Sequence, residues 1–237
     1  MNQRRPRRNR KSEAIRSLVA ENQLQISDFI YPMFIQEGQG ICMPISSMPG
    51  IHRYSIDTLL EELKEVVDLG IKSICLFPNY PESQKDSLAT ESYQSDTFYL
   101  RALAEVKAKF PELALMTDVA MDPYSSDGHD GIVKNGEILN DETLDVLAKM
   151  AVAQAQAGSK LIGPSDMMDG RVGYIRDSLD DAGFTNVGIM AYSAKYASAF
   201  YGPFRDALES APKFGDKKTY QMNPANSREA LREAELD

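Results

Sequence analysis

Apolar residues in this chain fall into two patterns that alternate along its length. Short, nearly continuous apolar runs are typical of strands buried on both faces, whereas apolar residues three or four positions apart are typical of helices buried on one face. The runs predict five strands, over residues 29–35, 71–77, 113–118, 160–163 and 187–191. The spaced pattern predicts helices between them, within 55–70, 97–109, 140–158 and 170–182.

Glycines punctuate this alternation, because Gly70, Gly158 and Gly183 close predicted helices shortly before the next strand. Repeated strand-then-helix units predict an α/β fold with an all-parallel sheet wrapped by helices. A doubly wound sheet and a (β/α)8 TIM barrel both fit this order. No strand is followed by Gly-x-Gly-x-x-Gly or by a phosphate-loop motif, so the barrel is favoured.

The two ends of the chain depart from the alternation. Residues 1–25 are interpreted as an N-terminal extended arm with a short amphipathic helix, and residues 26–237 as the barrel domain. The barrel domain includes a hairpin over 132–139, a mobile Lys-, Gly- and Pro-rich loop over 210–226, and a last helix from 225 onward. Five strands do not close a barrel of eight, so we expect a longer protein with three further units.

The composition is that of an ordinary soluble protein, since 43% of the 237 residues are hydrophobic and 26% are charged. Cys42 and Cys75 match no zinc or redox spacing, and the chain has neither a signal-type apolar region nor a run long enough to span a membrane. We therefore expect a cytoplasmic protein with no membrane partner. The net charge of −9 argues against nucleic acid as the main partner of the body.

Positive charge nevertheless gathers in the arm. Six of the first eleven residues are cationic: Arg4, Arg5, Arg7, Arg8, Arg10 and Lys11. This density suits a phosphate backbone or an acidic neighbouring subunit, and it also fits a solvated, mobile arm.

A single lysine, Lys195, follows the last predicted strand, and Arg205 follows ten residues later. Desolvation at the end of a buried strand disfavours an ammonium and would leave a neutral amine, which can attack a ketone and form a Schiff base. The planar guanidinium of Arg205 suits a carboxylate. The pair indicates a pocket for a small keto acid, and a surface Lys and Arg on a loop is the alternative.

In a barrel, the chemistry lies at the carboxyl ends of the strands. Asp118 ends the third predicted strand, Asp166 follows the fourth, and Lys195 follows the fifth. We therefore expect these three side chains at the same end of the sheet. A strand-end carboxylate such as Asp118 can also simply cap backbone amides.

Four blocks of sequence are distinctive. They are Thr117-Asp-Val119, Gly163-Pro-Ser-Asp-Met-Met-Asp-Gly-Arg171, the stretch from Gly188 to Arg205 that contains Lys195 and ends Phe-Tyr-Gly-Pro-Phe-Arg, and Lys218-Thr-Tyr-Gln-Met-Asn-Pro-Ala-Asn226. All four, in this order, resemble the porphobilinogen synthase family, also called 5-aminolevulinate dehydratase. The resemblance runs from Arg4 to Asp237.

The resemblance implies a TIM barrel whose arm embraces a neighbouring subunit in a homo-octamer. It implies condensation of two 5-aminolevulinate molecules to porphobilinogen, with loss of two waters, in tetrapyrrole (haem and chlorophyll) biosynthesis. Lys195 would form the Schiff base, and Asp118 would orient the amine or relay protons. Arg205 and Lys217 would hold a substrate carboxylate from a mobile lid whose closure excludes water.

The same resemblance bears on metal. Zinc-dependent members place three cysteines at the positions of Ala120, Asp122 and Asp130, where this chain has none. Thiolates select zinc and carboxylates suit magnesium, so we expect Mg²⁺ and no zinc. Asp122 and Asp130 are candidates for an active-site ion, although an acidic loop is more often only solvated. His129 is interpreted as a hydrogen-bonded loop residue rather than a proton carrier.

Magnesium-stimulated members use a glutamate in the last helix, which here is Glu233. An ion bound there would be allosteric, since it would stabilise one assembly state. The alternative is an ordinary surface pair between the helix's glutamates and arginines.

Two rival functions remain open. A class I aldolase would share the barrel and the Schiff-base lysine, but the chain shows no glycine loop for a sugar phosphate. A non-catalytic assembly or nucleic-acid module would use only the basic arm. The resemblance also places a second substrate-binding lysine beyond Asp237.

Overall fold

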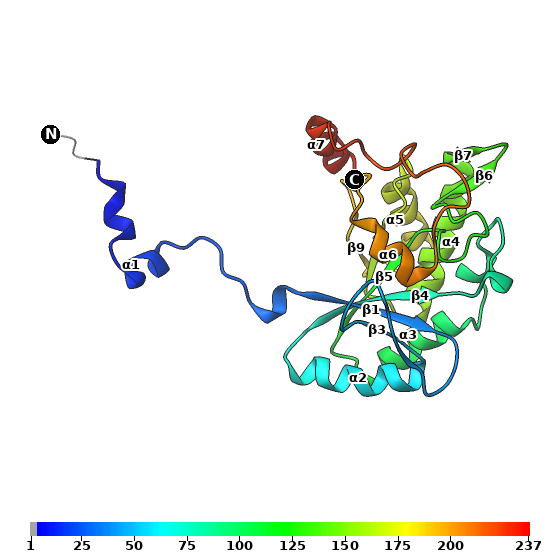
Figure 1. Ribbon diagram of the computed structural model, residues 1–237, viewed down its shortest axis with the longest axis horizontal. Coiled ribbons are helices and arrows are strands. Elements are labelled where there is room, and N and C mark those ends of the chain that lie inside the picture. Colours follow the sequence, from blue (N-terminus) through cyan, green and yellow to red (C-terminus); the bar gives the residue numbers. More distant parts are fainter. Residues whose placement is uncertain (1–3) are drawn as a thin grey trace.

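The computed structural model describes residues 4–237, which form a body and a long N-terminal arm (Figure 1). The body is built on a seven-stranded sheet with the order β2-β3-β1-β4-β5-β8-β9. Its main strands, all parallel, are β1 (Ile30–Gln36), β4 (Ser73–Asn79), β5 (Ala114–Val119), β8 (Leu161–Pro164) and β9 (Gly188–Ile189). They lie side by side in chain order. This order has no reversal, so the winding is that of a barrel and not of a doubly wound sheet.

Four helices cover one face of this sheet: α2 (Ile56–Asp68), α3 (Phe98–Lys109), α4 (Asn140–Ala157) and α5 (Arg171–Asp181). Alternate strand residues point at them, and Met33, Ile35 and Leu76 are each at most 2% exposed. Burying each such side chain contributes about 1.5–3 kcal/mol. Gly158 ends α4 with φ +121°, and a Cβ there would lie 2.3 Å from the Lys107 side chain, so helix α4 can end only on glycine at this contact.

The opposite face is covered by α6 (Tyr201–Leu208), a helix that the hydrophobic pattern did not predict. Phe204 of α6 packs edge-on against Phe77 of β4, with ring centroids 5.0 Å apart. The buried guanidinium of Arg53 donates to the Ala207 carbonyl at 2.7 Å and to the Glu209 carboxylate at 2.7 Å. Arg53 therefore fixes the carboxyl end of α6 against the sheet.

Shorter elements complete the body. The segment after β1 contains β2 (Cys42–Pro44) and β3 (His52–Tyr54), and the expected hairpin is β6 (Ile132–Lys134) with β7 (Glu137–Leu139). The last helix is α7 (Ser227–Leu236). Short 3-10 helices lie at Pro6–Arg10, Ile26–Asp28, Glu82–Gln84 and Thr90–Ser92.

The fifth strand is shorter than predicted, because β9 covers only Gly188–Ile189. Two further backbone hydrogen bonds continue its contact with β8, from Met190 N to Ile162 O and from Tyr192 N to Pro164 O. Since β9 is the last strand in the order of the sheet, it has a strand partner on one side only.

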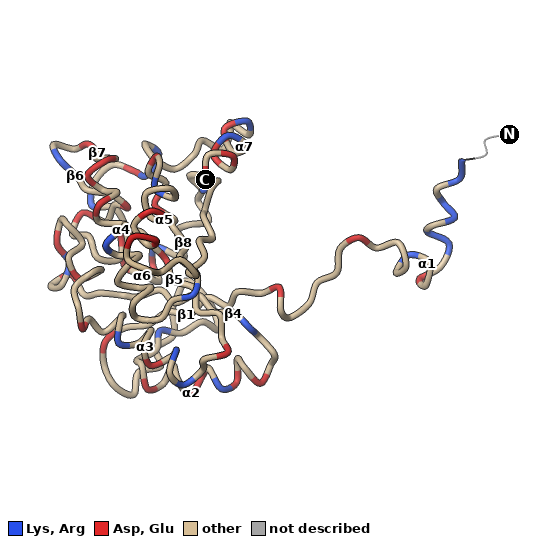
Figure 2. Tube along the Cα trace, turned by 180° about the vertical axis from the view of Figure 1, so that it is seen from behind, with Lys and Arg blue, Asp and Glu red and all other residues tan. Residues whose placement is uncertain are grey.

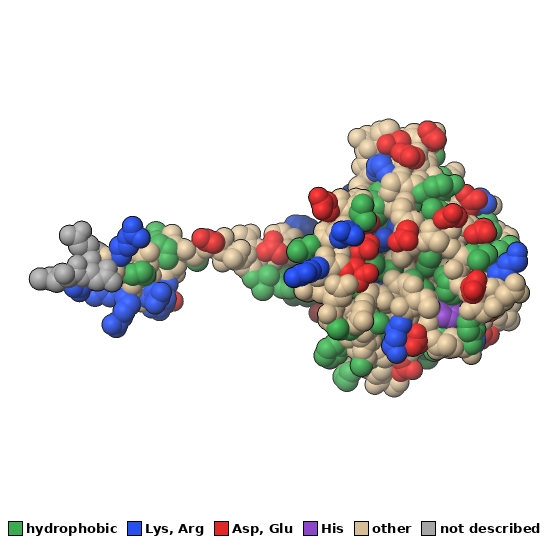
Figure 3. All heavy atoms as spheres, turned by 90° about the horizontal axis from the view of Figure 1, so that it is seen from above, with side chains coloured by type: hydrophobic (Ala, Val, Ile, Leu, Met, Phe, Trp, Pro, Cys, Tyr) green, Lys and Arg blue, Asp and Glu red, His purple; other side chains and the backbone are tan. Residues whose placement is uncertain are grey.

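The arm extends away from the body, and every residue from 4 to 29 is exposed (Figures 1 and 3). It carries α1 (Glu13–Leu18), which Ser12 caps by accepting a hydrogen bond from Ile15 N. Lys and Arg cluster along its outer half (Figure 2). Leu18 and Leu24 are 80% and 78% exposed, so the arm buries no apolar face against its own body. Residues 1–3 of the predicted arm lie outside the described residues.

Among residues 4–237, no helix is long and apolar enough to cross a membrane.

Candidate active site

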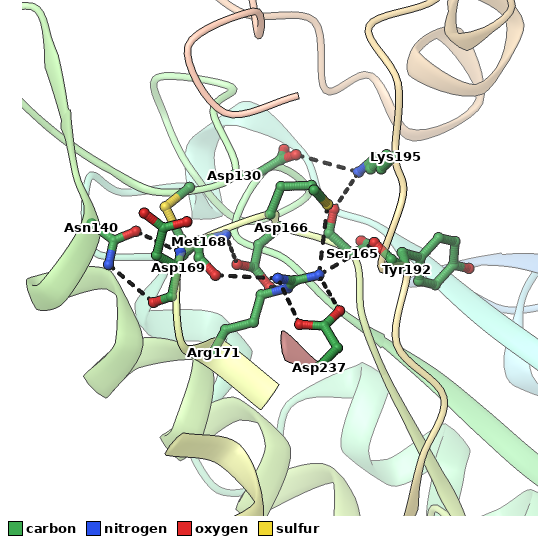
Figure 4. Close-up of polar contacts among 11 residues, drawn as sticks. Asp130, Asn140, Ser165, Asp166, Met168, Asp169, Arg171, Tyr192, Lys195 and Asp237 are labelled. Atoms are coloured by element: carbon green, nitrogen blue, oxygen red, sulfur yellow. Dashed lines mark hydrogen bonds and ion pairs between the residues drawn. The ribbon is translucent and has the colours of Figure 1, made fainter. Parts of the chain in front are cut away.

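Lys195 lies at the carboxyl end of the sheet, just after β9, and its side chain points toward the loop that follows β8 (Figure 4). Its Nζ donates to the Ser165 carbonyl at 2.6 Å and lies 3.4 Å from the Asp130 carboxylate. The ring of Tyr201 lies 5.5 Å from the same Nζ. Lys195, selected from the sequence as the Schiff-base lysine, therefore lies at the expected end of the strands.

A second lysine reaches the same carboxylate. Lys217, in the segment between α6 and α7, is 4% exposed. Its Nζ donates to Asp130 Oδ1 at 2.5 Å and to Asp122 Oδ2 at 3.1 Å. Asp130, which is completely buried, thus bridges the two ammonium groups.

Backbone contacts explain how the two lysines meet. Met222 N donates to the Lys195 carbonyl at 3.0 Å, and Ala197 N donates to the Met222 carbonyl at 2.9 Å, so the segment before α7 pairs with the chain around Lys195. At Gly128, φ is +69° and a Cβ would lie 2.3 Å from the Ala211 carbonyl. The segment predicted to be a mobile loop is packed here, and the absence of a side chain at Gly128 permits its close approach.

The ionisation of Lys195 differs from the sequence-based prediction of a neutral amine. Burial by itself would lower its pKa, but Asp130, Asp122 and Asp118 together outweigh that effect, and the pKa of Lys195 lies above its usual range. The prediction was wrong because it counted desolvation without the three carboxylates. The resting group is an ammonium.

The two lysines also act on Asp130. Burial would raise the pKa of its carboxyl, yet the charges of Lys217 and Lys195 hold that pKa below the usual value. For Lys217 the balance is similar, because burial lowers its pKa while Asp122 and Asp130 raise it, with a net rise. The cluster therefore stays charged and mutually paired in the interior.

Asp118, near the end of β5, behaves differently. Burial raises the pKa of its carboxyl to about 7, against the opposing influences of Lys195 and the Ser165 hydroxyl. A carboxyl with this pKa can accept and release a proton near neutral pH. Asp118 and Lys195 thus share one site, as expected from the strand ends.

The other predicted residues lie farther out. Arg205 is half-buried on α6, and its guanidinium makes no hydrogen bond or ion pair within residues 4–237; it lies close enough to Asp216 to help lower that carboxyl's pKa. Glu233 lies on α7 and lines a hollow of about 900 Å³ that is bounded also by Asp169 and Tyr220. That hollow lies beside the lysine cluster, and neither Lys195 nor Lys217 lines it.

The residues predicted as an active-site metal centre do not form one. The Lys217 ammonium lies between Asp122 and Asp130, where an ion would have to bind. Across residues 4–237, no group of three or more His, Cys, Asp or Glu side chains is arranged to hold a metal. We therefore derive no chemical step through an ion held by Asp122 and Asp130.

His129 confirms the interpretation as a hydrogen-bonded loop residue. Its Nδ1 lies 3.0 Å from the Tyr220 hydroxyl and its Nε2 lies 3.1 Å from the Phe214 carbonyl. Sequence analysis did not single out Tyr220 or the Ser165 carbonyl, although both lie inside the distinctive blocks of sequence. Those blocks were the available signal, and they mark segments without showing which atom is used.

Comparison with known proteins identifies the family of the chain. A family model described as delta-aminolevulinic acid dehydratase matches residues 3–237. The chloroplastic delta-aminolevulinic acid dehydratase of Glycine max is 55% identical over 99% of this chain, which covers 57% of that relative. The delta-aminolevulinic acid dehydratase of Synechococcus elongatus is 52% identical over 98% of this chain, which covers 72% of that relative. The chain thus spans little more than half the length of the plant relative.

A crystal structure of delta-aminolevulinic acid dehydratase (porphobilinogen synthase) from Toxoplasma gondii ME49, in complex with the reaction product porphobilinogen, matches with a TM-score of 0.95 at 53% identity. The match covers all of this chain and 68% of the other. The predicted α/β fold, with the parallel sheet of a TIM barrel, is confirmed. On these findings, the chain belongs to the delta-aminolevulinic acid dehydratase family.

Proposed function

We propose that the protein to which this chain belongs is a porphobilinogen synthase, which condenses two 5-aminolevulinate molecules with loss of two waters in tetrapyrrole biosynthesis. The observation that carries the proposal is the largely buried Lys195 amine, within electrostatic reach of Asp118, at the carboxyl end of a parallel sheet. Such a lysine is suited to covalent catalysis on a ketone through an imine.

Proton transfer follows from the two groups. Lys195 must lose a proton before it attacks the substrate carbonyl, and Asp118, which can hold a proton near neutral pH, is the proposed acceptor. Because the pKa of the resting Lys195 lies above its usual range, this transfer is uphill and only a small fraction of the amine is free at a time. Attack by the free amine forms the carbinolamine, and loss of water then gives the imine. The adjacent carbon is thereby made more acidic, and Asp118 is also the proposed relay for that proton.

Arg205 and Lys217 are proposed to bind a substrate carboxylate. Arg205 is available, since its guanidinium makes no ion pair within residues 4–237. Lys217 is paired with Asp122 and Asp130, so a substrate carboxylate would compete with those two for its ammonium. A substrate carboxylate at Lys217 would add negative charge beside Asp130, so its proposed role there is to hold and orient the substrate and not to lower the pKa of Lys195.

Magnesium is proposed at Glu233 as an allosteric ion, with no zinc. Burial, Asp169 and other carboxylates raise the pKa of Glu233, so negative charge is crowded there and a hard cation would relieve the repulsion. Glu233 would hold the ion together with water. The ion would supply charge neutralisation between assembled subunits.

We also propose the division into an arm (residues 1–25) and a barrel domain (26–237), a homo-octamer joined through the arm, and a cytoplasmic protein with no nucleic-acid or membrane partner. The exposed Leu18 and Leu24 support an arm that packs on another subunit. The plant relatives are named as chloroplastic, so the compartment is best read by locating the full-length protein in its own cell.

The test is borohydride trapping of the full-length protein with 5-aminolevulinate, followed by peptide mass analysis. We expect a reduced adduct on Lys195 that Lys195→Met abolishes. Lys218→Met is the matched control, because Lys218 is adjacent to the site in sequence but its side chain is 75% exposed and pairs with Asp216. A folded wild-type protein that gives no adduct on Lys195 would refute the proposal, and trapping only with a sugar phosphate would favour an aldolase.

A further inference from the structure

Arg171, the first residue of α5, is one of the largest fully buried side chains, at 2% exposure. Its guanidinium connects two loops that leave neighbouring strands at the carboxyl end of the sheet (Figure 4). Nη1 lies 3.3 Å from the Met168 carbonyl in the loop after β8. Nη2 lies 3.3 Å from the Tyr192 carbonyl in the chain after β9.

Carboxylates surround the same guanidinium. Asp237 lies 3.2 Å from Nη2, and Asp166 Oδ2 lies 3.7 Å from Nε. The other oxygen of Asp166 accepts from Met168 N at 2.7 Å, which fixes the loop internally. Arg171 Nε and Asp166 Oδ2 are both buried and have no hydrogen-bond partner among residues 4–237, so a small closure of the loop would join them.

These contacts lie directly behind the reactive amine. Ser165, whose carbonyl accepts from Lys195 Nζ, immediately precedes Asp166, and Tyr192 stands three residues before Lys195. The Asp118 carboxyl also bonds to the Ser165 side chain. A shift of the β8 loop relative to the β9 loop would therefore change the positions of Ser165 and Lys195 together.

We propose that Arg171, with Asp166, is a positioning residue for Lys195. By crosslinking the two loops it sets the distance between the Lys195 amine, the Ser165 carbonyl and Asp118. The inference rests on the proposed function for its catalytic meaning, but the positioning itself is a property of the fold. Burying a guanidinium costs free energy. The planar guanidinium can contact both loops at once, which a lysine ammonium cannot do.

Arg176 provides an internal comparison on the same helix. It also donates to backbone carbonyls, of Val187 at 2.6 Å and Phe184 at 3.1 Å, and pairs with Asp180. Those carbonyls precede β9, at the opposite end of the strand from Lys195. Arg176 therefore holds α5 to the sheet without touching the loops around the amine.

The experiment uses the full-length protein and two measurements on Arg171→Met and Arg176→Met. The first is competitive acetylation of Lys195 over a range of pH, read by mass spectrometry, which needs no substrate. For Arg171→Met we expect the midpoint to fall by about one pH unit, because looser contacts with Ser165 and Asp130 stabilise the ammonium less. The second is the rate of borohydride trapping with 5-aminolevulinate, which we expect to fall about 10²-fold.

Arg176→Met should leave the midpoint and the trapping rate per folded molecule as in the wild type, whatever its effect on the melting temperature. Arg171→Lys should be more stable than Arg171→Met but should show nearly the same acetylation midpoint and trapping rate. It replaces Arg171→Met in the experiment if Arg171→Met does not fold. A midpoint unchanged in the Arg171 variants, or changed equally in Arg176→Met, would overturn the positioning role. Absence of trapping in the wild type would instead overturn the proposed function, and the acetylation midpoint would still decide the positioning.

Discussion

At the amino ends of the parallel strands, the ammonium of Lys160 bonds to backbone carbonyls near solvent, whereas at the carboxyl ends two lysine ammonium groups bond to a shared carboxylate in the interior. Lys160, before β8, donates to the carbonyls of Pro111 and Leu113. Beyond β9, Lys195 and Lys217 share the buried carboxylate of Asp130. The contacts of Lys160 stabilise the amino ends of the strands. The contacts of Lys195 and Lys217 with Asp130 bring the three charges so close together that the pKa of each depends on the others.

The role of a lysine in this protein therefore depends on its burial and its bonding partners and not on its residue type alone. An exposed ammonium bonded to carbonyls contributes about 1 kcal/mol and can be replaced cheaply. A buried ammonium bonded to carboxylates loses much more when its partner is removed, because an uncompensated charge then stays in the interior. A mutation at the amino ends of the strands can therefore change stability without changing the reactivity of Lys195, whereas a mutation at the carboxyl ends changes both.

The largest effect is expected from Asp130→Asn, which removes the shared partner of both lysines. We predict a loss of about 3–5 kcal/mol in the free energy of unfolding, measured by urea titration. We also expect a lower pKa for Lys195, read by acetylation, because Asp130 is the first carboxylate among those that raise it. Asp127→Asn is the matched control, since the Asp127 side chain makes no hydrogen bond within residues 4–237. Equal losses in the two variants would remove the distinction between the two ends.

A substitution in the core between the sheet and the helices tests the opposite case, in which the free energy of unfolding falls and the reactivity of Lys195 is unchanged. Leu63 of α2 is completely buried, so Leu63→Ala should cost about 2–5 kcal/mol through lost burial and a residual cavity. The rate of borohydride trapping at Lys195, corrected for the folded fraction, should be unchanged. Leu69→Ala, at a site 60% exposed, should cost less than about 0.5 kcal/mol. A trapping rate that falls with Leu63→Ala would show that the two regions are coupled.

The sequence was sufficient to predict the regular parts of the fold and the end of the sheet at which Lys195 lies. The five parallel strands and the helices α2 to α5 follow from apolar spacing, because both faces of the sheet are buried. Helix α6 was missed, since its Gly202-Pro203 pair opposes a helix reading and its packing on Phe77 is a tertiary contact.

The ionisation of the site could not be read from spacing. Lys195 and Asp130 are 65 positions apart, and Lys217 and Asp122 are 95 apart, so their pairing depends on how the loops fold back over the strand ends. Desolvation alone predicts a neutral Lys195, and only the folded arrangement adds the carboxylates that reverse the sign. Motif resemblance located the lysine but did not give its charge.

The pH dependence of the free energy of unfolding tests the burial of Asp166 at the carboxyl end, and the expected effect is smaller than those above. Burial raises the pKa of Asp166 from its ordinary 3.8 to about 7, so the unfolded chain loses this proton first as the pH rises. Stability from this group therefore falls between about pH 4 and pH 7 and is constant above. Asp166→Asn should gain about 1–3 kcal/mol relative to the wild type on going from pH 4.5 to pH 7.5, measured by chemical denaturation at both values.

Part of the wild-type decline will persist in that variant, because Asp118 has a similarly raised pKa. Asp177→Asn, at an exposed position on α5, should leave the pH dependence as in the wild type. A wild-type stability that rises steadily from pH 4.5 to pH 7.5, and equally in Asp166→Asn, would contradict the buried, raised carboxyl.

The smallest effect is expected at the amino ends, where Lys160→Met removes two hydrogen bonds to carbonyls. Because the side chain lies near solvent, water can take over both carbonyls, and the loss should be about 1 kcal/mol or less by urea titration. Trapping at Lys195 and its acetylation midpoint should not move. Lys160→Met is the matched control for Lys217→Met at the carboxyl end, because both variants replace a lysine by methionine. Lys217→Met would leave Asp122 and Asp130 facing each other without their shared cation. If the two variants lost equal stability, burial would not be the variable that separates the two ends of the sheet.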